Sequence, residues 1–165
     1  LPGEAPDLDV SVARLEFSGP LTITQTAFAT PDPDGAITLL ALDADPFGAT
    51  GGNIEVEGTG PEAYLTNWKH ANYRLEYHLK SGRAGKWKVE AEIAATEPVQ
   101  LKMKVGDSVQ TVDIPSTGGE LQWKPLPLGL VDLPEEETIL ELKPEGENWQ
   151  PINLRKIRLV LVDAS

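Results

Sequence analysis

The chain has 165 residues, of which 40% are hydrophobic and 24% are charged, and its formal net charge is −12. This composition is typical of one folded domain with a buried core, and it excludes an intrinsically disordered chain. The absence of cysteine excludes disulfides and thiolate metal sites. No apolar run approaches the roughly 20 residues that cross a bilayer, so we expect no transmembrane helix. The first residues, "LPGEAPDLDV", lack the features of a signal peptide and are expected to begin inside a longer precursor.

The charges are distributed unevenly along the chain. Residues 1–68 hold 11 of the 26 acids and one base, Arg14, whereas the remainder holds 15 acids and 13 bases. An acidic half argues against nucleic acid or an anionic membrane as a partner, because phosphate contacts need clustered Lys and Arg. It is compatible with cation binding, although solubility of a secreted protein is the simpler interpretation.

Alternating apolar and polar residues predict short β-strands along the whole chain. The 15 glycines and 14 prolines argue against long helices, and turn sequences such as "PDPDG" and "PSTGG" separate the alternating segments. The expected strands are 12–17, 21–29, 36–43, 54–58, 73–79, 86–95, 99–105, 108–114, 121–126, 138–143 and 157–162. Many short strands at nearly regular spacing predict an all-β fold, an antiparallel β-sandwich of the jelly-roll kind.

The segment "PDPDG" at residues 31–35 is the one plausible domain boundary. We expect residues 1–33 to be a lead-in or a set of strands added to the main fold. Residues 34–165 are then the β-jelly roll itself. No convincing internal repeat or low-complexity segment divides the chain further.

One strand pairing follows from side-chain matching. If residues 86–95 and 99–105 form a hairpin around "TEP", Glu90 faces Lys102 across the strands, and the apolar residues of both strands share the other face. This register predicts polar residues outside and apolar residues inside. It also places Trp87 in the core.

No constellation of catalytic residues is evident. The two histidines, His70 and His78, fall on different elements without a metal-binding spacing, and no nucleophile elbow or phosphate-binding loop occurs. A pair of carboxylates could in principle hydrolyse a glycosidic bond, but nothing in the sequence selects one pair. We therefore expect that the chain is not an enzyme by itself.

Three tryptophans in polar surroundings are candidate ligand contacts: Trp68, Trp123 and Trp149. Flat aromatic rings flanked by Asn, Gln and Lys suit sugar recognition, since the apolar face of a pyranose stacks on the ring while amides bond its hydroxyls. The alternative is that each ring closes the core at one end of the sandwich. The sequence leaves this choice open.

Three stretches resemble, in order, domains of carbohydrate-active proteins. "DGAITLLALDADPFG" with the following "NIEVEG" resembles the opening of jelly-roll domains attached to bacterial glycoside hydrolases, notably α-L-fucosidases, and "KSGRAGKWKVEAEIAA" is similar to a later strand of these domains. The closing half, from "VDIPSTGGELQWKPLPLG" onward, resembles carbohydrate-binding modules of families six and thirty-five. The resemblance covers about residues 34–163. It implies a galactose-binding-like β-jelly roll with a sugar site at one end or edge of the sandwich.

The resemblance also implies roles for individual residues. Asn153 matches the ligand-bonding Asn before the last strand, and Trp68 matches a Trp in the loop after the second strand. Trp123 lies nearest the aromatic that follows Thr-Gly-Gly, although Glu120 stands directly after that motif where the modules often have Trp. Trp149 has no counterpart in the family pattern and is a candidate on its chemistry only.

A structural calcium is a further implication, because many of these modules bind one with acidic residues near the first and last strands. Asp43, Asp45 and Asp163 stand in the corresponding places. Carboxylates are suitable oxygen ligands for this hard cation. The alternative is that they are solvated carboxylates at strand ends.

The sequence thus predicts a non-catalytic carbohydrate-binding module of a larger secreted carbohydrate-active enzyme, either extracellular or periplasmic. Its expected partners are a polysaccharide or oligosaccharide and the catalytic domain of the parent enzyme. The main alternative is a structural β-sandwich that braces a catalytic domain without binding sugar. A surface adhesion or protein-interaction domain is a third possibility.

Overall fold

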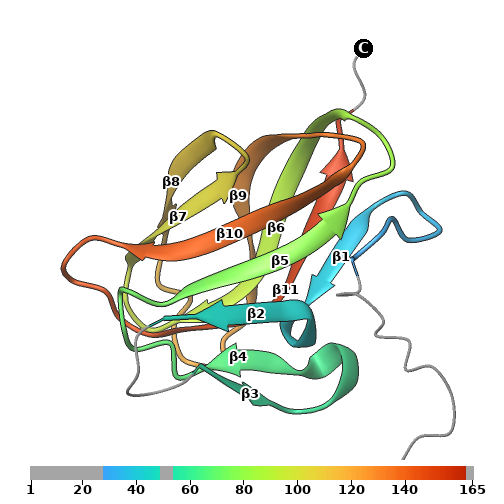
Figure 1. Ribbon diagram of the computed structural model, residues 1–165. Coiled ribbons are helices and arrows are strands. Elements are labelled where there is room, and N and C mark those ends of the chain that lie inside the picture. Colours follow the sequence, from blue (N-terminus) through green and yellow to red (C-terminus); the bar gives the residue numbers. More distant parts are fainter. Residues whose placement is uncertain (1–27, 49–53, 163–165) are drawn as a thin grey trace, which may run out of the picture.

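The computed structural model describes residues 28–48 and 54–162, which form two antiparallel β-sheets packed face to face (Figure 1). The six-stranded sheet has the order β3-β4-β11-β6-β9, and β1 also pairs with β11. The five-stranded sheet has the order β2-β5-β10-β7-β8. The predicted all-β antiparallel sandwich is therefore confirmed.

The strands have between 3 and 11 residues. Those of the six-stranded sheet are β1 (Ile37–Leu40), β3 (Glu55–Glu57), β4 (Tyr64–Thr66), β6 (Gly85–Ala95), β9 (Lys124–Leu133) and β11 (Ile152–Leu161). Those of the five-stranded sheet are β2 (Ala44–Phe47), β5 (Arg74–Lys80), β7 (Val99–Val105), β8 (Ser108–Ile114) and β10 (Glu137–Glu145). The 3-10 helices η1 (Ala41–Asp43) and η2 (Gly60–Glu62) have three residues each. Among the described residues, no helix has the length and hydrophobicity that crossing a membrane requires.

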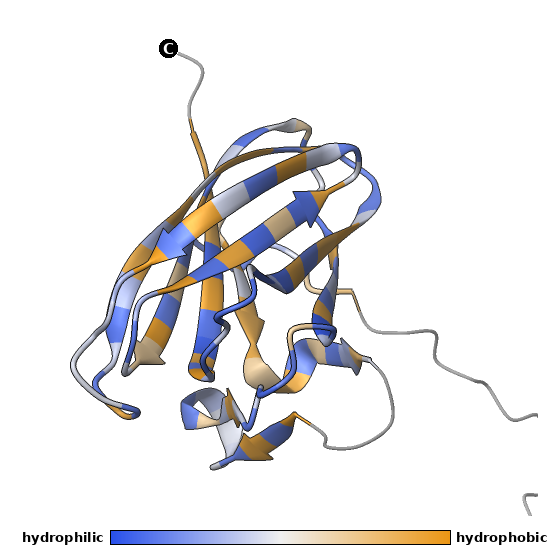
Figure 2. Cartoon of the chain, turned by 90° about the vertical axis from the view of Figure 1, so that its left-hand side faces the viewer, coloured by the Kyte–Doolittle hydropathy of each residue, from blue (hydrophilic) through white to orange (hydrophobic). Residues whose placement is uncertain are grey.

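The core forms between the inward faces of the two sheets. Hydrophobic and hydrophilic residues alternate along the strands (Figure 2), so each strand presents one apolar face. On β5, for example, Leu75, Tyr77 and Leu79 are fully buried whereas the residues between them face outward. Burying a side chain of this size stabilises the fold by about 1.5–3 kcal/mol relative to leaving it exposed.

The predicted hairpin between residues 86–95 and 99–105 is wrong. β6 pairs with β9 and β11 in the six-stranded sheet, whereas β7 pairs with β8 and β10 in the other sheet. The link between β6 and β7 crosses from one sheet to the other, and Glu90 pairs with Arg158 rather than with Lys102. The inward set was predicted correctly, since Trp87 is 1% exposed and Met103 is also buried. Periodicity cannot distinguish a hairpin from a crossing of this kind, because both arrangements bury the same residues.

Several strand boundaries differ from the predicted ones. The strands 99–105 and 108–114 match β7 and β8, whereas β2 and β4 were not predicted. β9 was expected to end at residue 126 but continues to Leu133 despite Pro125 and Pro127. The strand tolerates both prolines because it pairs on one side only, with β6, so their missing N–H groups need no partner.

At the N-terminal side, the predicted strand 12–17 and residues 21–27 of the predicted strand 21–29 lie outside the described residues. Ala29 forms a parallel bridge with Leu79 of β5, and its amide and carbonyl groups bond to the backbone of β5 at 3.0 and 2.8 Å. The division of the chain between residues 33 and 34 stays a prediction.

The edge strands β8 and β9 are joined by a side chain between the two sheets. The Nε2 of Gln110 donates a hydrogen bond to the carbonyl oxygen of Leu130 at 2.9 Å. Gly129 makes room for this contact, since a Cβ at that position would lie 2.6 Å from the Oε1 of Gln110. Its φ of +122° also lies in a region that other residues rarely adopt.

Candidate functional site

Two rows of side chains cross the outer face of the six-stranded sheet near its β3 edge. Leu154 of β11 pairs with Leu65 of β4, and both face the core. The residues flanking this pair therefore face outward, because successive side chains on a strand alternate between faces. Row one consists of Glu55, Thr66, Asn153 and Ala94, and row two consists of Glu57, Tyr64, Arg155 and Glu92.

Row one forms part of the lining of a hollow of about 440 Å³. The small side chain of Ala94, opposite Asn153 on the neighbouring strand, leaves space between the larger residues on either side. Ala94 is 1% exposed, yet it lies outside the cluster of side chains that makes the core. It therefore forms part of the wall of the hollow, and most of the other lining residues are polar.

The hollow contains both hydrogen-bond donors and hydrogen-bond acceptors. Asn67 adopts a left-handed backbone conformation with φ of 62°, and its Nδ2 donates to the Oε1 of Glu55 at 3.2 Å. The Nδ2 of Asn153 donates to the backbone oxygen of Glu120 at 2.7 Å, which ties the loop before β9 to β11. The side chains of Glu120 and Lys69 make no hydrogen bond or ion pair with any described residue. They thus leave a carboxylate and an ammonium group available to a ligand.

Row two lies beside the hollow, and the ring of Trp123 packs against two of its residues. The ring of Tyr64 meets Trp123 edge-on, with 5.3 Å between centroids, and the guanidinium of Arg155 lies 4.2 Å from the centroid of Trp123. The Tyr64 hydroxyl donates to Glu57, which also lines the hollow. This bond to a carboxylate raises the pKa of Tyr64 above its ordinary value.

A bulge in β11 places Arg155 beneath the ring. The register with β6 shifts between Leu154 and Lys156, so Arg155 and Lys156 both face outward. Arg155 Nη1 lies 3.0 Å from a carboxylate oxygen of Glu92 and 3.4 Å from one of Glu62, and Lys156 Nζ lies 3.3 Å from Glu92. Arg155 is thus held by two carboxylates on one side and by an aromatic ring on another.

Trp68 and Trp149 close the core, which is the alternative that the sequence left open. They are 1% and 8% exposed, and their rings meet edge-on with 5.3 Å between centroids. The Nε1 of Trp149 donates to the carbonyl oxygen of Trp68 at 2.7 Å, and the Nε1 of Trp68 donates to that of Tyr73 at 3.4 Å. Neither ring offers a face to a ligand in this structure, so neither belongs to the hollow that contains Asn153.

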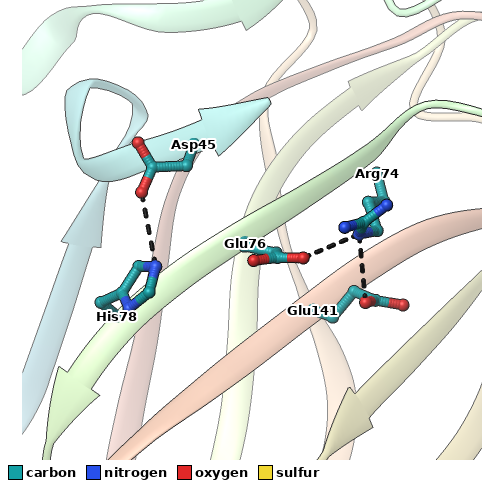
Figure 3. A network of polar contacts seen from close by, with 5 residues as sticks. All are labelled: Asp45, Arg74, Glu76, His78 and Glu141. Carbon is teal, nitrogen blue, oxygen red and sulfur yellow. Dashed lines mark hydrogen bonds and ion pairs between the residues drawn. The ribbon is translucent and has the colours of Figure 1, made fainter. Parts of the chain in front are cut away.

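The carboxylates considered for calcium have other partners. Asp43 accepts a hydrogen bond from the backbone N–H of Leu40 at 2.7 Å, and Asp45 lies 3.5 Å from the Nε2 of His78 (Figure 3). No cluster of three potential metal ligands occurs among residues 28–48 and 54–162. The third predicted ligand, Asp163, lies outside the described residues. Calcium therefore stays a prediction.

Of the residues in the two rows, only Asn153 belongs to the sequence-based site, and the others were missed, among them Ala94, Tyr64 and Arg155. Tyr64 lies on a three-residue strand that is too short to show a clear alternation. For Arg155 a signal was present in "INLRKIRL", where the apolar positions change parity between Leu154 and Ile157. Such a change indicates a bulge with two consecutive outward residues.

Solved structures with a similar fold include carbohydrate-binding modules. A family 35 carbohydrate binding module from Clostridium thermocellum matches with a TM-score of 0.64 and 14% identity, over 77% of this chain and 98% of that one. The module CsCBM6-3 from Clostridium stercorarium, solved in complex with cellobiose, matches with a TM-score of 0.63 and 14% identity, over 82% of this chain and 98% of that one.

A module within a longer enzyme is also similar. The GH26-CBM35 β-(1,4)-mannanase from Podospora anserina matches with a TM-score of 0.64 and 18% identity, over 80% of this chain but only 29% of the mannanase. The sequence matches no protein-family model and no curated protein sequence. The fold is thus the β-jelly roll of carbohydrate-binding modules, as the sequence predicted.

Proposed function

We propose that the chain is a non-catalytic carbohydrate-binding module that holds a polysaccharide or oligosaccharide in the hollow of row one. The observation that carries this proposal is the position of Asn153. It lies in a polar hollow on the outer face of the six-stranded sheet, in a sandwich whose fold is that of carbohydrate-binding modules. The position agrees with the role that the sequence resemblance implies for this residue.

The lining of the hollow suits sugar hydroxyls. The Oδ1 of Asn153 and the carboxylate of Glu120 accept hydrogen bonds, and the ammonium of Lys69 donates them. Hydrogen bonds to charged groups are stronger than neutral ones, and a hydroxyl can act as donor and acceptor at once. The hollow therefore provides the complementary groups that a sugar ring needs along its polar edge.

The chain acts as an accessory domain in this proposal. The mannanase from Podospora anserina combines a module of this fold with a catalytic domain in one chain. By analogy, we propose a parent carbohydrate-active enzyme as the second partner, with a location outside the cytoplasm. The chain itself then supplies affinity for the polysaccharide rather than a reaction.

A panel of polysaccharides in native affinity gels tests the proposal. Cellulose derivatives, mannan, xylan, β-1,3-glucan and β-1,3-galactan are suitable members. We expect retardation of the wild-type chain by at least one of them, and a parallel loss of retardation in Asn153→Ala. Equal mobility in all gels, with tryptophan fluorescence that no sugar changes, would contradict the proposal.

A structural brace without sugar affinity is the second candidate. The burial of Trp68 and Trp149 favours it, because two of the three predicted rings stabilise the sandwich rather than face a ligand. The same gels separate the candidates, since a brace is not retarded. A brace should instead raise the melting temperature of the parent enzyme when both domains are present in one chain.

A further inference from the structure

We infer that the hollow selects glycans that carry free amino groups, and that Glu120 is the residue that determines this preference. The ligand then contains amino sugars such as glucosamine, rather than neutral or acidic sugars alone. This inference rests on the proposed function and specifies the chemical class of glycan that the same site takes. It comes from the charges that line the hollow and from the way Glu120 is held.

The lining of the hollow carries more negative than positive charge. Among the described residues that form it, Glu55, Glu57 and Glu120 carry carboxylates, whereas Lys69 alone carries an ammonium group. The pKa of Tyr64, beside the hollow, is raised mainly by its hydrogen bond to Glu57 and, to a smaller extent, by the charge of Glu120. Two of the three carboxylates thus act on the same point at the rim of the hollow.

The loop between β8 and β9, which carries Glu120, is fixed to two strands. On β6, the backbone N–H of Ala95 donates to the Oγ1 of Thr117 at 2.8 Å, and the N–H of Thr117 donates to the carbonyl oxygen of Ala95 at 2.8 Å. On β11, the Nδ2 of Asn153 donates to the backbone oxygen of Glu120 at 2.7 Å. Thr117 is 5% exposed, so its bonds are shielded from water. The backbone of Glu120 is therefore held at the hollow, while its carboxylate makes no hydrogen bond or ion pair with any described residue.

The other two carboxylates of the lining also have capacity for a ligand. Glu55 accepts a hydrogen bond from Asn67, and Glu57 accepts one from Tyr64. An ionised carboxylate has about four acceptor sites, so one such bond does not saturate it. The protonated amino group of a sugar has three N–H donors, like the ammonium group of lysine. One such group can therefore bond to oxygens of more than one residue of the lining.

The charge of the lining distinguishes three classes of glycan. A hydrogen bond between an ammonium group and a carboxylate is roughly twice as strong as one between neutral groups. A hydroxyl in the same position lacks the charge, and a uronate or sulfate group would meet charges of its own sign. An amino sugar therefore gains more from this hollow than a neutral sugar with the same ring, and an acidic sugar gains less. Lys69 opposes this preference, which makes it a second position for a test.

Titration calorimetry with three β-1,4-linked tetramers tests the inference. The tetramers of glucose, glucosamine and N-acetylglucosamine share one backbone and differ only in the group at C2, which is a hydroxyl, an ammonium or an amide. We expect the glucosamine tetramer to bind the wild-type chain about tenfold tighter than either of the others at low salt. This ratio should fall to about two in about 1 M salt, because salt screens the attraction.

Three variants identify the source of the preference. Glu120→Gln keeps an acceptor but removes the charge, and it should lower the ratio about threefold. Lys69→Met removes the opposing ammonium group and should raise the ratio about threefold. Glu136→Gln is the matched control, since it removes the same charge from an exposed side chain outside the lining and should leave the ratio unchanged. This control is needed because a net charge of −12 attracts any polycation.

The outcomes separate this inference from the proposed function. Equal affinities for the three tetramers, or no binding of any of them alongside retardation by a neutral polysaccharide, would overturn the inference and leave the proposed function intact. An unchanged ratio in Glu120→Gln, or an equal fall in Glu120→Gln and Glu136→Gln, would do the same. The melting temperature of each variant checks that it is folded. Absence of binding to every sugar and polysaccharide would overturn both.

Discussion

The indole N–H of Trp149 donates a hydrogen bond to the backbone carbonyl of Trp68, 81 residues earlier in the chain. The two rings also meet edge-on, and both are buried. This contact ties the loop before β11 to the loop after β4. The two tryptophans therefore stabilise loops that lie next to the strands that form the hollow, β4 and β11.

Replacement of Trp149 should lower the free energy of unfolding. We expect Trp149→Ala to cost about 3–5 kcal/mol, because it leaves a large cavity against Trp68. Trp149→Phe should cost about 1–3 kcal/mol, since the carbonyl of Trp68 loses its buried donor. Urea denaturation measures both values, and Trp123→Ala, the same change at a partly exposed ring, is the control with a smaller loss. A similar loss in Trp149→Ala and Trp123→Ala would contradict this assignment.

Filling the hollow should abolish glycan binding without unfolding the chain. Ala94→Leu introduces a larger side chain beside Asn153, and we expect at least about a tenfold loss of affinity in the polysaccharide gels. Because Ala94 is 1% exposed, the larger side chain can also cost about 1–3 kcal/mol of stability, and the melting temperature of the variant checks that it stays folded. Thr111→Leu, an equivalent change on the exposed face of the other sheet, should leave retardation unchanged. Full retardation of Ala94→Leu would place the site elsewhere.

Gly129 should tolerate no side chain. We expect Gly129→Ala to destabilise the chain by about 1–3 kcal/mol, because of the positive φ and the close approach of Gln110. Gly146→Ala is the matched control, since its φ of +88° is also positive but no heavy atom lies within 4 Å of the added Cβ. Gln110→Ala should recover part of the loss when combined with Gly129→Ala. Equal costs at the two glycines would show that contact with Gln110 is unimportant.

The bond between Tyr64 and Glu57 should be visible in an alkaline titration. The bond raises the folded-state pKa of Tyr64 above the ordinary value of 10.0, so its stabilising effect is complete below that pH and is lost as pH rises through the raised pKa. Ultraviolet absorbance of the phenolate measures this pKa, and Tyr64→Phe identifies the signal. Glu57→Gln should return the pKa towards 10. An unchanged titration curve in Glu57→Gln would contradict the assignment.

Calcium should raise the melting temperature if Asp43, Asp45 and Asp163 share a cation. Free calcium at 100 times its dissociation constant stabilises a folded chain by about 2.7 kcal/mol, equivalent to a rise of about 5–10 °C for this length. Asp45→Asn should reduce the rise, and Asp132→Asn, a change at a surface carboxylate on β9, should not. Equal melting temperatures in chelator and in millimolar calcium would contradict the prediction of a calcium site.

The fold could be predicted from the sequence because it depends on alternation. The inward residues of β6 and β7 are visible as every second apolar residue, and Trp87 was assigned to the core for that reason. The order of the strands in each sheet depends on long-range pairing. A period of two residues shows which side chains face inward but does not show which strands pair. For this reason Lys102 was predicted as the cross-strand partner of Glu90, whereas the structure pairs Glu90 with Arg158.

The candidate site could be predicted only in part. Asn153 was identified by its place before the last strand, a local feature of the sequence. Arg155 and Ala94 acquire their roles from the register of β11 against β4 and β6, which brings together residues that are far apart in the sequence. The environment of each tryptophan depends on loop packing, and polar neighbours in sequence did not reveal that Trp68 and Trp149 contact each other.

The prolines of β9 have a consequence for the behaviour of the molecule in solution. An edge strand with free N–H and C=O groups is a template on which another chain can add a strand, the first step of aggregation. Pro125 and Pro127 lack N–H groups, and they lie in a strand that also carries the exposed side chain of Leu130. They should therefore keep this edge from recruiting further chains, so that the domain stays dispersed at high local concentration.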